Sequence, residues 1–246
     1  MTPYLIEGPA VISFSGGRTS GYMLRKILDV GLQPDVHVVF ADTGQERPET
    51  LQFVRDVEAH WGVPIQWVER PGKFTQLITD KKYLPNPVAR FCTQELKLAP
   101  MRKWMIAQGH ESWTNVVGIR SDEPRRVARL KAQAEKRRER WDVIMPLAEA
   151  KVVEQDVIDF WAASPFTINL PVGESNCDIC FLKGVKKRIQ IIRDFPHLAD
   201  WWIEQERRIG GTFRHDTPSY AHLAAQQDLF TDGEYDEDIV ECFCHD

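Results

Sequence analysis

The feature that most constrains the fold is a regular alternation of short apolar runs and amphipathic segments over the first 150 residues. Residues 10–14 form an apolar run that ends in Ser15-Gly16-Gly17, a pattern typical of a buried strand followed by a turn. A helix is predicted from Thr19 or Ser20 to about residue 30, where Gly31 ends it. The same reasoning predicts strands at 36–40, 65–68, 114–119 and 143–145, and helices at 49–61 and 94–108.

Strands that alternate with helices along the chain indicate βαβ units and a mostly parallel sheet with helices on both faces. The expected fold class is therefore α/β, with a Rossmann-like, doubly wound sheet. Ligands of such sheets bind beyond the carboxyl ends of the strands. We therefore expect the functional residues in the segments that follow the predicted strands.

The pattern changes after Pro146. Helices are predicted at 152–162 and 186–208, with a proline-containing loop between them. Residues 228–246 contain eight Asp and Glu and no Lys or Arg, which is typical of a mobile acidic tail. The sequence thus predicts an α/β domain (1–150), a helical extension (151–227) and an acidic C-terminal tail (228–246).

Composition narrows the class of protein. The 246 residues are enough to bury a core without a disulfide framework. No apolar run approaches the roughly 20 residues of a membrane span, and the N-terminus lacks the basic flank of a secretory signal. We expect a cytoplasmic protein without a membrane partner, and the sequence leaves the oligomeric state open.

The charge distribution is uneven. The chain has 31 Lys and Arg against 36 Asp and Glu, which argues against non-specific binding of nucleic acid by the whole surface. Residues 120–140, however, contain nine Lys and Arg and four Asp and Glu. This segment is either a solvated helix face or a local anion site for phosphate, sulfate or nucleic acid.

The loop after the first predicted strand resembles the PP-loop of the adenine-nucleotide alpha-hydrolase superfamily. Glycines allow the backbone to approach a ligand closely, and the N–H groups of the following helix then face an anion. The superfamily pattern is Ser-Gly-Gly-Lys-Asp-Ser, and here Arg and Thr replace the Lys and Asp. The resemblance implies a nucleotide-binding domain whose loop residues are Ser15, Gly16, Gly17, Arg18, Thr19 and Ser20.

Two further blocks follow later strands and resemble segments of the sulfonucleotide reductases, which reduce adenosine phosphosulfates to sulfite. The first block is Asp42-Thr43-Gly44 followed by Pro48-Glu49-Thr50, and the second is Gly118-Ile119-Arg120. The resemblance implies that Asp42, Thr43 and Gly44 border the nucleoside. It also implies that Arg120, with Lys97 and Arg126, neutralises the charged leaving portion of the substrate.

The five cysteines are the remaining chemical feature. Cys177 and Cys180 form a C-x-x-C pair, which by itself is equally a zinc half-site, a redox pair or an iron–sulfur half-site. Cys92 and Lys97 resemble the upstream cluster motif of the adenylylsulfate reductases, in which a tandem Cys-Cys precedes the Lys. Thr93 stands where the second Cys of that tandem is expected.

The C-terminal Glu241-Cys242-Phe243-Cys244-His245 resembles the family's Glu-Cys-Gly-Leu-His motif. The resemblance assigns the nucleophile to Cys242 and a catalytic role to His245. Cys244 then joins Cys92, Cys177 and Cys180 as a ligand of a 4Fe-4S cluster, although Cys242 is the other candidate for that place. Zinc is the alternative metal, because four thiolates also hold Zn²⁺.

The resemblance implies a phosphoadenosine phosphosulfate (PAPS) or adenylylsulfate reductase. In such an enzyme a thiolate attacks the sulfur, and a second thiol or a thioredoxin-like donor releases sulfite. The altered residues at 18, 19 and 93 leave two alternatives open. One is an ATP-dependent, cluster-dependent sulfurtransferase that thiolates tRNA or DNA, which would use the 120–140 segment to bind nucleic acid. The other is a non-catalytic nucleotide or redox sensor.

Overall fold

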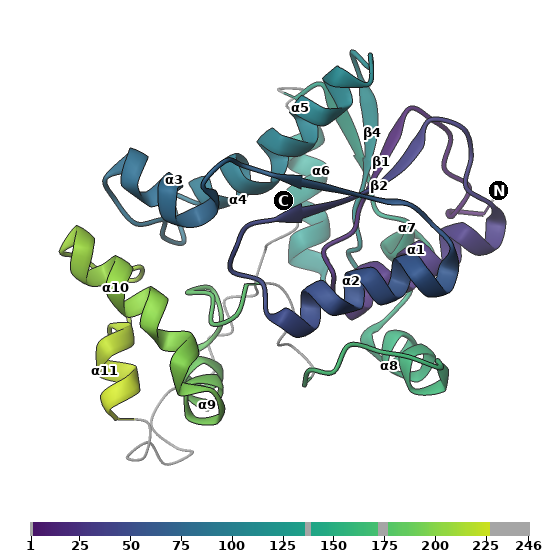
Figure 1. Cartoon of the computed structure of the whole chain (residues 1–246). Coiled ribbons are helices and arrows are strands. Elements are labelled where there is room, and N and C mark those ends of the chain that lie inside the picture. The colour runs from purple at the N-terminus through teal and green to yellow at the C-terminus, as the bar shows by residue number, and fades with distance from the viewer. Residues whose placement is uncertain (1, 136–138, 172–176, 227–246) are drawn as a thin grey trace.

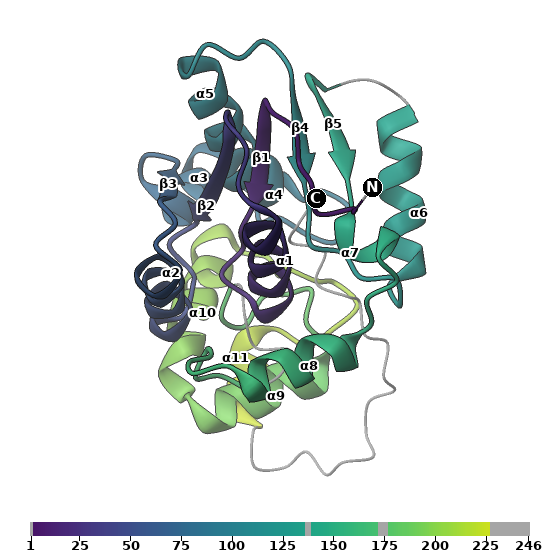
Figure 2. The same cartoon turned by 90° about the vertical axis from the view of Figure 1, so that its right-hand side faces the viewer.

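The computed structural model describes residues 2–135, 139–171 and 177–226. Its centre is a five-stranded sheet in the order β3-β2-β1-β4-β5, and every neighbouring pair is parallel (Figure 2). The predicted α/β class and parallel sheet are therefore confirmed. The strands are β1 (Ala10–Ser13), β2 (Val36–Asp42), β3 (Ile65–Glu69), β4 (Trp113–Val116) and β5 (Trp141–Ile144).

Helices cover both faces of the sheet, because alternate residues of each central strand are apolar on both sides. Ile12 and Phe40 lie in the core beneath α1, α2 and α8, whereas Val11 and Val39 pack against α5 on the opposite face. The α-helices between residues 18 and 163 are α1 (Arg18–Val30), α2 (Pro48–Trp61), α3 (Lys73–Lys81), α4 (Phe91–Thr93), α5 (Ala99–Ala107), α6 (Pro124–Glu135), α7 (Pro146–Glu149) and α8 (Glu154–Ala163).

A second hydrophobic core lies beyond the carboxyl ends of the strands (Figures 1 and 2). It is built by α3 and by α9 (Val185–Asp194), α10 (Ala199–Ile209) and α11 (Tyr220–Ala225). Trp202 is fully buried at its centre, and its indole N–H donates a hydrogen bond to the Asp178 carboxylate at 2.8 Å. The segment that contains the C-x-x-C pair therefore packs into this helical core.

Two predicted helices are interrupted in the structure. The helix expected at 94–108 contains a π-helical turn, η1 (Gln94–Leu98), between α4 and α5. The helix expected at 186–208 is divided at Pro196, which begins the short 3-10 turn η2 (Pro196–Leu198) between α9 and α10. Proline has no backbone N–H and clashes with the preceding turn, so a continuous helix cannot pass through this position.

The remaining sequence-based expectations have mixed outcomes. No helix in the described ranges is both long enough and apolar enough to cross a membrane. The predicted mobile tail at 228–246 lies outside the described residues, and the division of the chain at 150 and 227 stays a prediction.

One buried carboxylate holds the C-terminal helices together. Glu206 of α10 accepts hydrogen bonds from the backbone N–H groups of Phe213 at 3.2 Å and Tyr220 at 2.9 Å. Burial of the carboxylate raises the pKa of Glu206 against the effect of these two donors. The carboxylate thus accepts from two backbone N–H groups that have no helical acceptor: Phe213, in the turn after α10, and Tyr220, the first residue of α11.

We expect Glu206→Ala to lower the free energy of unfolding by about 2–3 kcal/mol, because it leaves two buried N–H groups without an acceptor. Urea unfolding followed by circular dichroism measures this change. Glu204→Ala, which removes an exposed pair with Arg207 on the same helix, is the matched control and should change stability by less than about 0.5 kcal/mol. Equal effects of the two substitutions would contradict this account of Glu206.

Candidate active site

The segments that follow β1, β2 and β4 meet at the carboxyl edge of the sheet. The chain progresses from β1 to β2 and β3 on one side and then returns to β4 on the other side of β1. Such a reversal of strand order opens a crevice at the carboxyl ends of the two central strands. The three sequence blocks singled out above therefore face one place.

The glycine loop is closed by two serine hydroxyls. The Ser20 hydroxyl lies 2.9 Å from that of Ser15, accepts from the Ser15 backbone N–H at 3.2 Å and donates to the Gly17 carbonyl at 3.0 Å. These bonds hold the loop against the N-terminus of α1, whose positive end of the helix dipole favours an anion.

Two glycines allow this loop to pack closely. Gly16 has a φ of +73°, and a Cβ there would lie 2.8 Å from the Thr50 methyl group. Gly118, from the block after β4, approaches α1 so closely that a Cβ would lie 3.2 Å from the Ser20 Cα. The third block is thus in contact with the first, and Gly118 is a positioning glycine that was not among the predicted site residues.

The resemblance implies that Arg18 contacts the phosphate of a nucleotide, whereas in the structure its side chain contacts backbone carbonyls. Its guanidinium donates to the backbone carbonyls of Ile168 at 3.0 Å and Leu170 at 2.6 Å, with a longer contact to Pro171. Burial lowers the pKa of Arg18. In this structure the side chain fastens the segment after α8 to the start of α1, and Thr19 beside it accepts a 3.4 Å hydrogen bond from Arg120.

The turn after β2 is held by carboxylates. The Asp42 carboxylate accepts from the Gly44 N–H at 2.8 Å and from the Lys73 ammonium at 2.6 Å. Glu46 accepts from the Thr43 hydroxyl at 2.7 Å and from the backbone N–H groups of Thr43 and Gly44. Thr43 is 1% exposed, so it supports the turn from inside, whereas Gly44 is exposed at its surface.

Glu46 of this turn was not among the site residues predicted from the sequence. Burial raises the pKa of Glu46, and the positive charge of Lys97 is the largest opposing influence. Lys97 lies in η1, so the π-helical turn brings its charge toward the turn after β2. Glu46 lies inside the quoted block of residues 42–50, and its spacing of three residues from Thr43 is the signal that identifies such a turn.

The turn after β2 also contacts the C-x-x-C segment directly. The Thr43 hydroxyl lies 3.7 Å from the Cys177 sulfur. Glu46 and Cys177 form an isolated antiparallel bridge, and the Asp178 N–H donates to the Gln45 carbonyl at 2.9 Å. The predicted nucleoside border and the predicted metal ligands are therefore in contact.

The described cysteines are gathered in one place. Cys177 and Cys180 are buried in the second core, and Cys92 packs against the same core. These three thiols come from distant parts of the chain and pack against one core.

Thiolates of this kind are ligands for an iron–sulfur cluster and equally for Zn²⁺. Thr93, at the position of the missing tandem cysteine, is buried and offers no thiolate. The other predicted site residues of the tail, Cys242, Cys244 and His245, lie outside the described residues.

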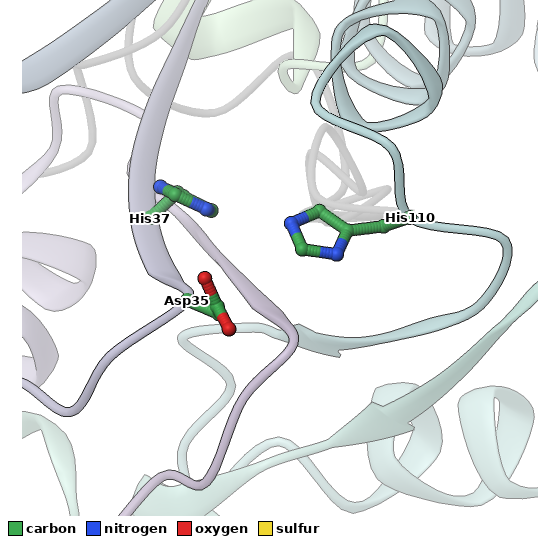
Figure 3. A group of neighbouring side chains, drawn as sticks. All are labelled: Asp35, His37 and His110. Atoms are coloured by element: carbon green, nitrogen blue, oxygen red, sulfur yellow. The ribbon is translucent and has the colours of Figure 1, made fainter.

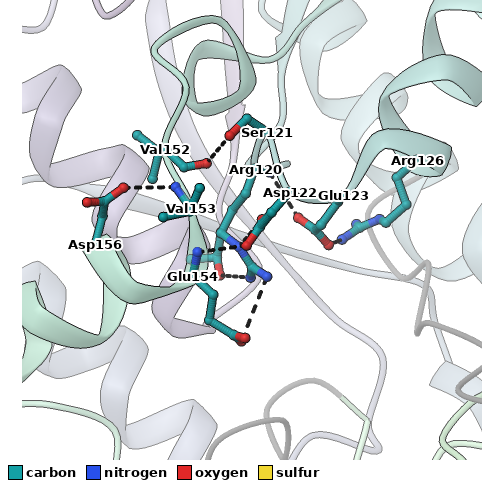
Figure 4. Close-up of polar contacts among 10 residues, drawn as sticks. Arg120, Ser121, Asp122, Glu123, Arg126, Val152, Val153, Glu154 and Asp156 are labelled. Atoms are coloured by element: carbon teal, nitrogen blue, oxygen red, sulfur yellow. Dashed lines mark hydrogen bonds and ion pairs between the residues drawn. The ribbon is translucent and has the colours of Figure 1, made fainter. Parts of the chain in front are cut away.

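Arg120 lies beside the glycine loop but is surrounded by acids (Figure 4). Its guanidinium donates to Asp122 at 2.8 Å and lies 3.7 Å from the Glu154 carboxylate at the start of α8. The Ser121 hydroxyl donates to the Val152 carbonyl at 2.7 Å, and the Asp122 carboxylate accepts from the Glu154 N–H at 2.9 Å. These bonds fix the loop to the N-terminus of α8. Any anion that Arg120 binds competes with these two carboxylates.

Arg126 is less accessible than its place in a basic segment implies. It is 6% exposed and pairs with Glu123, which directly precedes α6 (Figure 4). Arg125 and Lys131, by contrast, are exposed on the same helix. The outward positive charge of the described part of 120–140 is therefore smaller than the count of basic residues indicates.

Comparisons with known proteins place this site in a family. Residues 9–169 match the model of the phosphoadenosine phosphosulfate reductase domain. The nin region protein ORF290 of Escherichia phage lambda is 33% identical over 205 residues, which are 72% of this chain and 67% of the phage protein. A Methanocaldococcus jannaschii protein is 37% identical over 119 residues, which are 48% of this chain and 24% of that protein.

Two solved structures are also similar. Phosphoadenylyl-sulfate reductase from Candida auris, in a phosphate complex, has 16% identity and a TM-score of 0.47, over 69% of this chain and 82% of its own. The U34-tRNA thiolase NcsA from Methanococcus maripaludis, solved with its 4Fe-4S cluster, has 16% identity and a TM-score of 0.47, over 88% of this chain and 72% of its own.

We expect Gly16→Ala to lower the free energy of unfolding by about 2–4 kcal/mol, from left-handed backbone strain and the close contact with Thr50. Urea unfolding measures the change. Gly211→Ala is the matched control, because a Cβ there meets no atom within 4 Å, and it should be nearly neutral. A neutral Gly16→Ala would show that the loop does not require this backbone conformation.

We expect Arg18→Lys to lower the free energy of unfolding by about 2 kcal/mol, because an ammonium cannot reach the carbonyls of residues 168 and 170 together. Thermal and urea unfolding measure this loss. Arg25→Lys, which alters an exposed pair with Asp29 on the same helix, should have an effect below about 0.5 kcal/mol. Unchanged stability with a large loss of nucleotide affinity would instead assign Arg18 to the ligand.

Proposed function

Because this chain belongs to the phosphoadenosine phosphosulfate reductase domain family, we propose that it is an enzyme that binds an adenine nucleotide and transfers sulfur to a thiol. The preferred substrate is an adenosine phosphosulfate, PAPS or adenylylsulfate. The nucleotide lies at the carboxyl edge of the sheet, against the loop of residues 15–20 and the surface of the turn at Gly44.

The observation that carries this proposal is the contact between the turn after β2 and the C-x-x-C segment. The 3.7 Å approach of the Thr43 hydroxyl to the Cys177 sulfur brings the nucleotide edge and the thiol-rich core into one site. The contact favours a reaction in which a nucleotide-linked group meets sulfur.

The reaction requires a thiolate and a leaving group. The Cys242 thiolate attacks the sulfur of the phosphosulfate, an S–S bond forms, and the S–O bond breaks to release the nucleotide. A second thiol, from Cys244 or a thioredoxin-like donor, then attacks Cys242 and releases sulfite while the two thiols become a disulfide. Lys97 and Arg120 offset the negative charge of the departing phosphate, and His245 lies in the same motif as the nucleophile.

The described thiols fit an iron–sulfur cluster, with Cys92, Cys177 and Cys180 as ligands and Cys244 as the fourth. Soft thiolates that come from distant parts of the chain and pack against one core support this assignment. When bound, a 4Fe-4S cluster would supply an electrostatic influence at Lys97, five residues from Cys92. Thr43 positions Cys177 relative to the nucleotide edge.

One observation favours a second candidate function. Thr93 is buried where the reductase motif has a cysteine, so the upstream segment provides one ligand and not two. Three protein ligands would leave one iron accessible to a sulfur donor, which suits an ATP-dependent sulfurtransferase that thiolates tRNA or DNA. The exposed Arg125 and Lys131 of α6 are then candidates for nucleic-acid contacts.

The decisive experiment combines metal analysis with activity assays on PAPS, on adenylylsulfate, and on ATP with tRNA or DNA. The full chain is purified anaerobically, its iron, sulfide and zinc are measured, and it is incubated with PAPS or adenylylsulfate and thioredoxin. Release of sulfite supports the reductase. Absence of sulfite, with pyrophosphate release from ATP that depends on tRNA or DNA, supports the sulfurtransferase. Nucleotide binding with neither turnover would favour a sensor, and a colourless protein with one zinc would contradict the cluster.

We expect Cys242→Ser to lower the rate of sulfite release by roughly 10³-fold or more, because the hydroxyl is a poor nucleophile without a base. Nucleotide affinity, measured by calorimetry, should change less than about threefold, which controls for misfolding. Full sulfite release by Cys242→Ser would contradict the assigned nucleophile.

A further inference from the structure

A second group of ligand-type side chains lies at the opposite edge of the sheet from the candidate active site. Asp35, His37 and His110 offer donor atoms that all lie within 4.8 Å of one another (Figure 3). They come from the start of β2 and from the connection between α5 and β4. None of the sequence motifs or the proposed sulfur chemistry uses these residues.

The backbone fixes the first two side chains. The Asp35 carbonyl accepts from the Ala10 N–H at 2.9 Å, and its φ of +58° lies in the left-handed region that Asp tolerates. His37 is the second residue of β2 and pairs with Val11 in the sheet. Its ring packs edge-on against Trp104 of α5, with 5.0 Å between ring centroids.

The third side chain is placed by the end of α5. The His110 N–H donates to the Met105 carbonyl at 3.2 Å, and the Gly109 N–H donates to the Ile106 carbonyl at 3.0 Å. Gly109 has a φ of +92°, which completes a Schellman motif with residue 110 as its last member. The motif directs the chain back toward β2, and the ring centroids of His110 and His37 lie 5.8 Å apart.

The chemistry of the group suits a borderline metal ion. Two imidazoles and one carboxylate are a common ligand set for Zn²⁺ and related divalent ions. The Nε2 atom of His37 is buried and has no hydrogen-bond partner among the described residues.

We propose that Asp35, His37 and His110 bind one Zn²⁺ ion, with water completing the coordination on the exposed side of Asp35. Tetrahedral Zn²⁺, with bonds of about 2.0–2.1 Å, places its ligand atoms about 3.3 Å apart. The donor atoms, which lie within 4.8 Å of one another, therefore need to move closer together when the ion binds. Modest rotations of these partly exposed side chains are enough for that movement.

The ion fastens the connection between α5 and β4 to the beginning of β2. α5 covers one face of the sheet and packs there against Trp113 at the start of β4, so this bond closes that face at its edge. Because the group lies at the amino ends of the strands, the ion acts on stability and does not take part in sulfur transfer. The proposal is therefore independent of the proposed function.

Cobalt and zinc titrations of the full chain test the site. We expect the wild type to bind one more equivalent of Co²⁺ than His110→Ala. The additional equivalent should give weak visible bands without the near-ultraviolet charge-transfer absorption of a thiolate–cobalt site, which separates it from the cysteines. Asp35→Asn, an exposed substitution that keeps the backbone conformation, should weaken zinc binding at least about tenfold.

Stability provides the second measurement. Saturating Zn²⁺ should raise the Tm of the wild type by roughly 5 °C and leave that of His110→Ala unchanged. His222→Ala, which removes an exposed histidine of α11, is the matched control and should keep the wild-type response. Equal cobalt stoichiometry in the wild type, His110→Ala and Asp35→Asn would overturn the proposal, and so would a full zinc response in both variants.

Discussion

The antiparallel bridge between Glu46 and Cys177 joins two hydrophobic cores that belong to different parts of the chain. On one side are the turn after β2 and the sheet, and on the other side are α3, α9, α10 and α11. The Arg47 guanidinium, 2% exposed and 4.1 Å from the Phe195 ring centroid, reinforces the junction. The geometry of the candidate site depends on this junction, because it fixes how far the thiols lie from the nucleotide edge.

The same turn explains why so few residues of the site face outward. The Thr43 hydroxyl bonds internally to Glu46 and Cys177, and the Asp42 carboxylate is paired with the Lys73 ammonium. Arg120 is likewise neutralised by Asp122 and Glu154. Charges that are held in place by neighbouring acids need little reorganisation when a substrate anion exchanges with one of those acids.

Local sequence signals identified most of the fold. The apolar run at 10–14, followed by glycines, corresponds to β1 and α1, because strand burial on both faces and a glycine turn are encoded within a few residues. The helix break at Pro196 was not foreseen, although proline carries that signal, and α3 and α6 were not predicted. The class of fold was thus predictable, whereas the breaks depended on tertiary packing.

The sequence blocks that form the site were predictable, but the contacts between their side chains were not. The blocks around residues 15–20 and 42–44 were found from strand ends, because topology forces those ends to one edge. The carbonyl contacts of Arg18 and the contact of Arg120 with Glu154 join positions more than 30 residues apart, and no local pattern reveals them. The roles of the site residues, including those of the tail, stay predictions.

The π-helical turn between α4 and α5 has a consequence for the register of the chain. A regular helix rotates by about 100° per residue, so the one extra residue in a π turn rotates everything before it relative to everything after it. Cys92 and Lys97 face the second core and the turn after β2, while Met101 and Met105 keep their places on the sheet. A single inserted residue therefore gives one continuous helical rod two independent orientations, one for packing and one for chemistry.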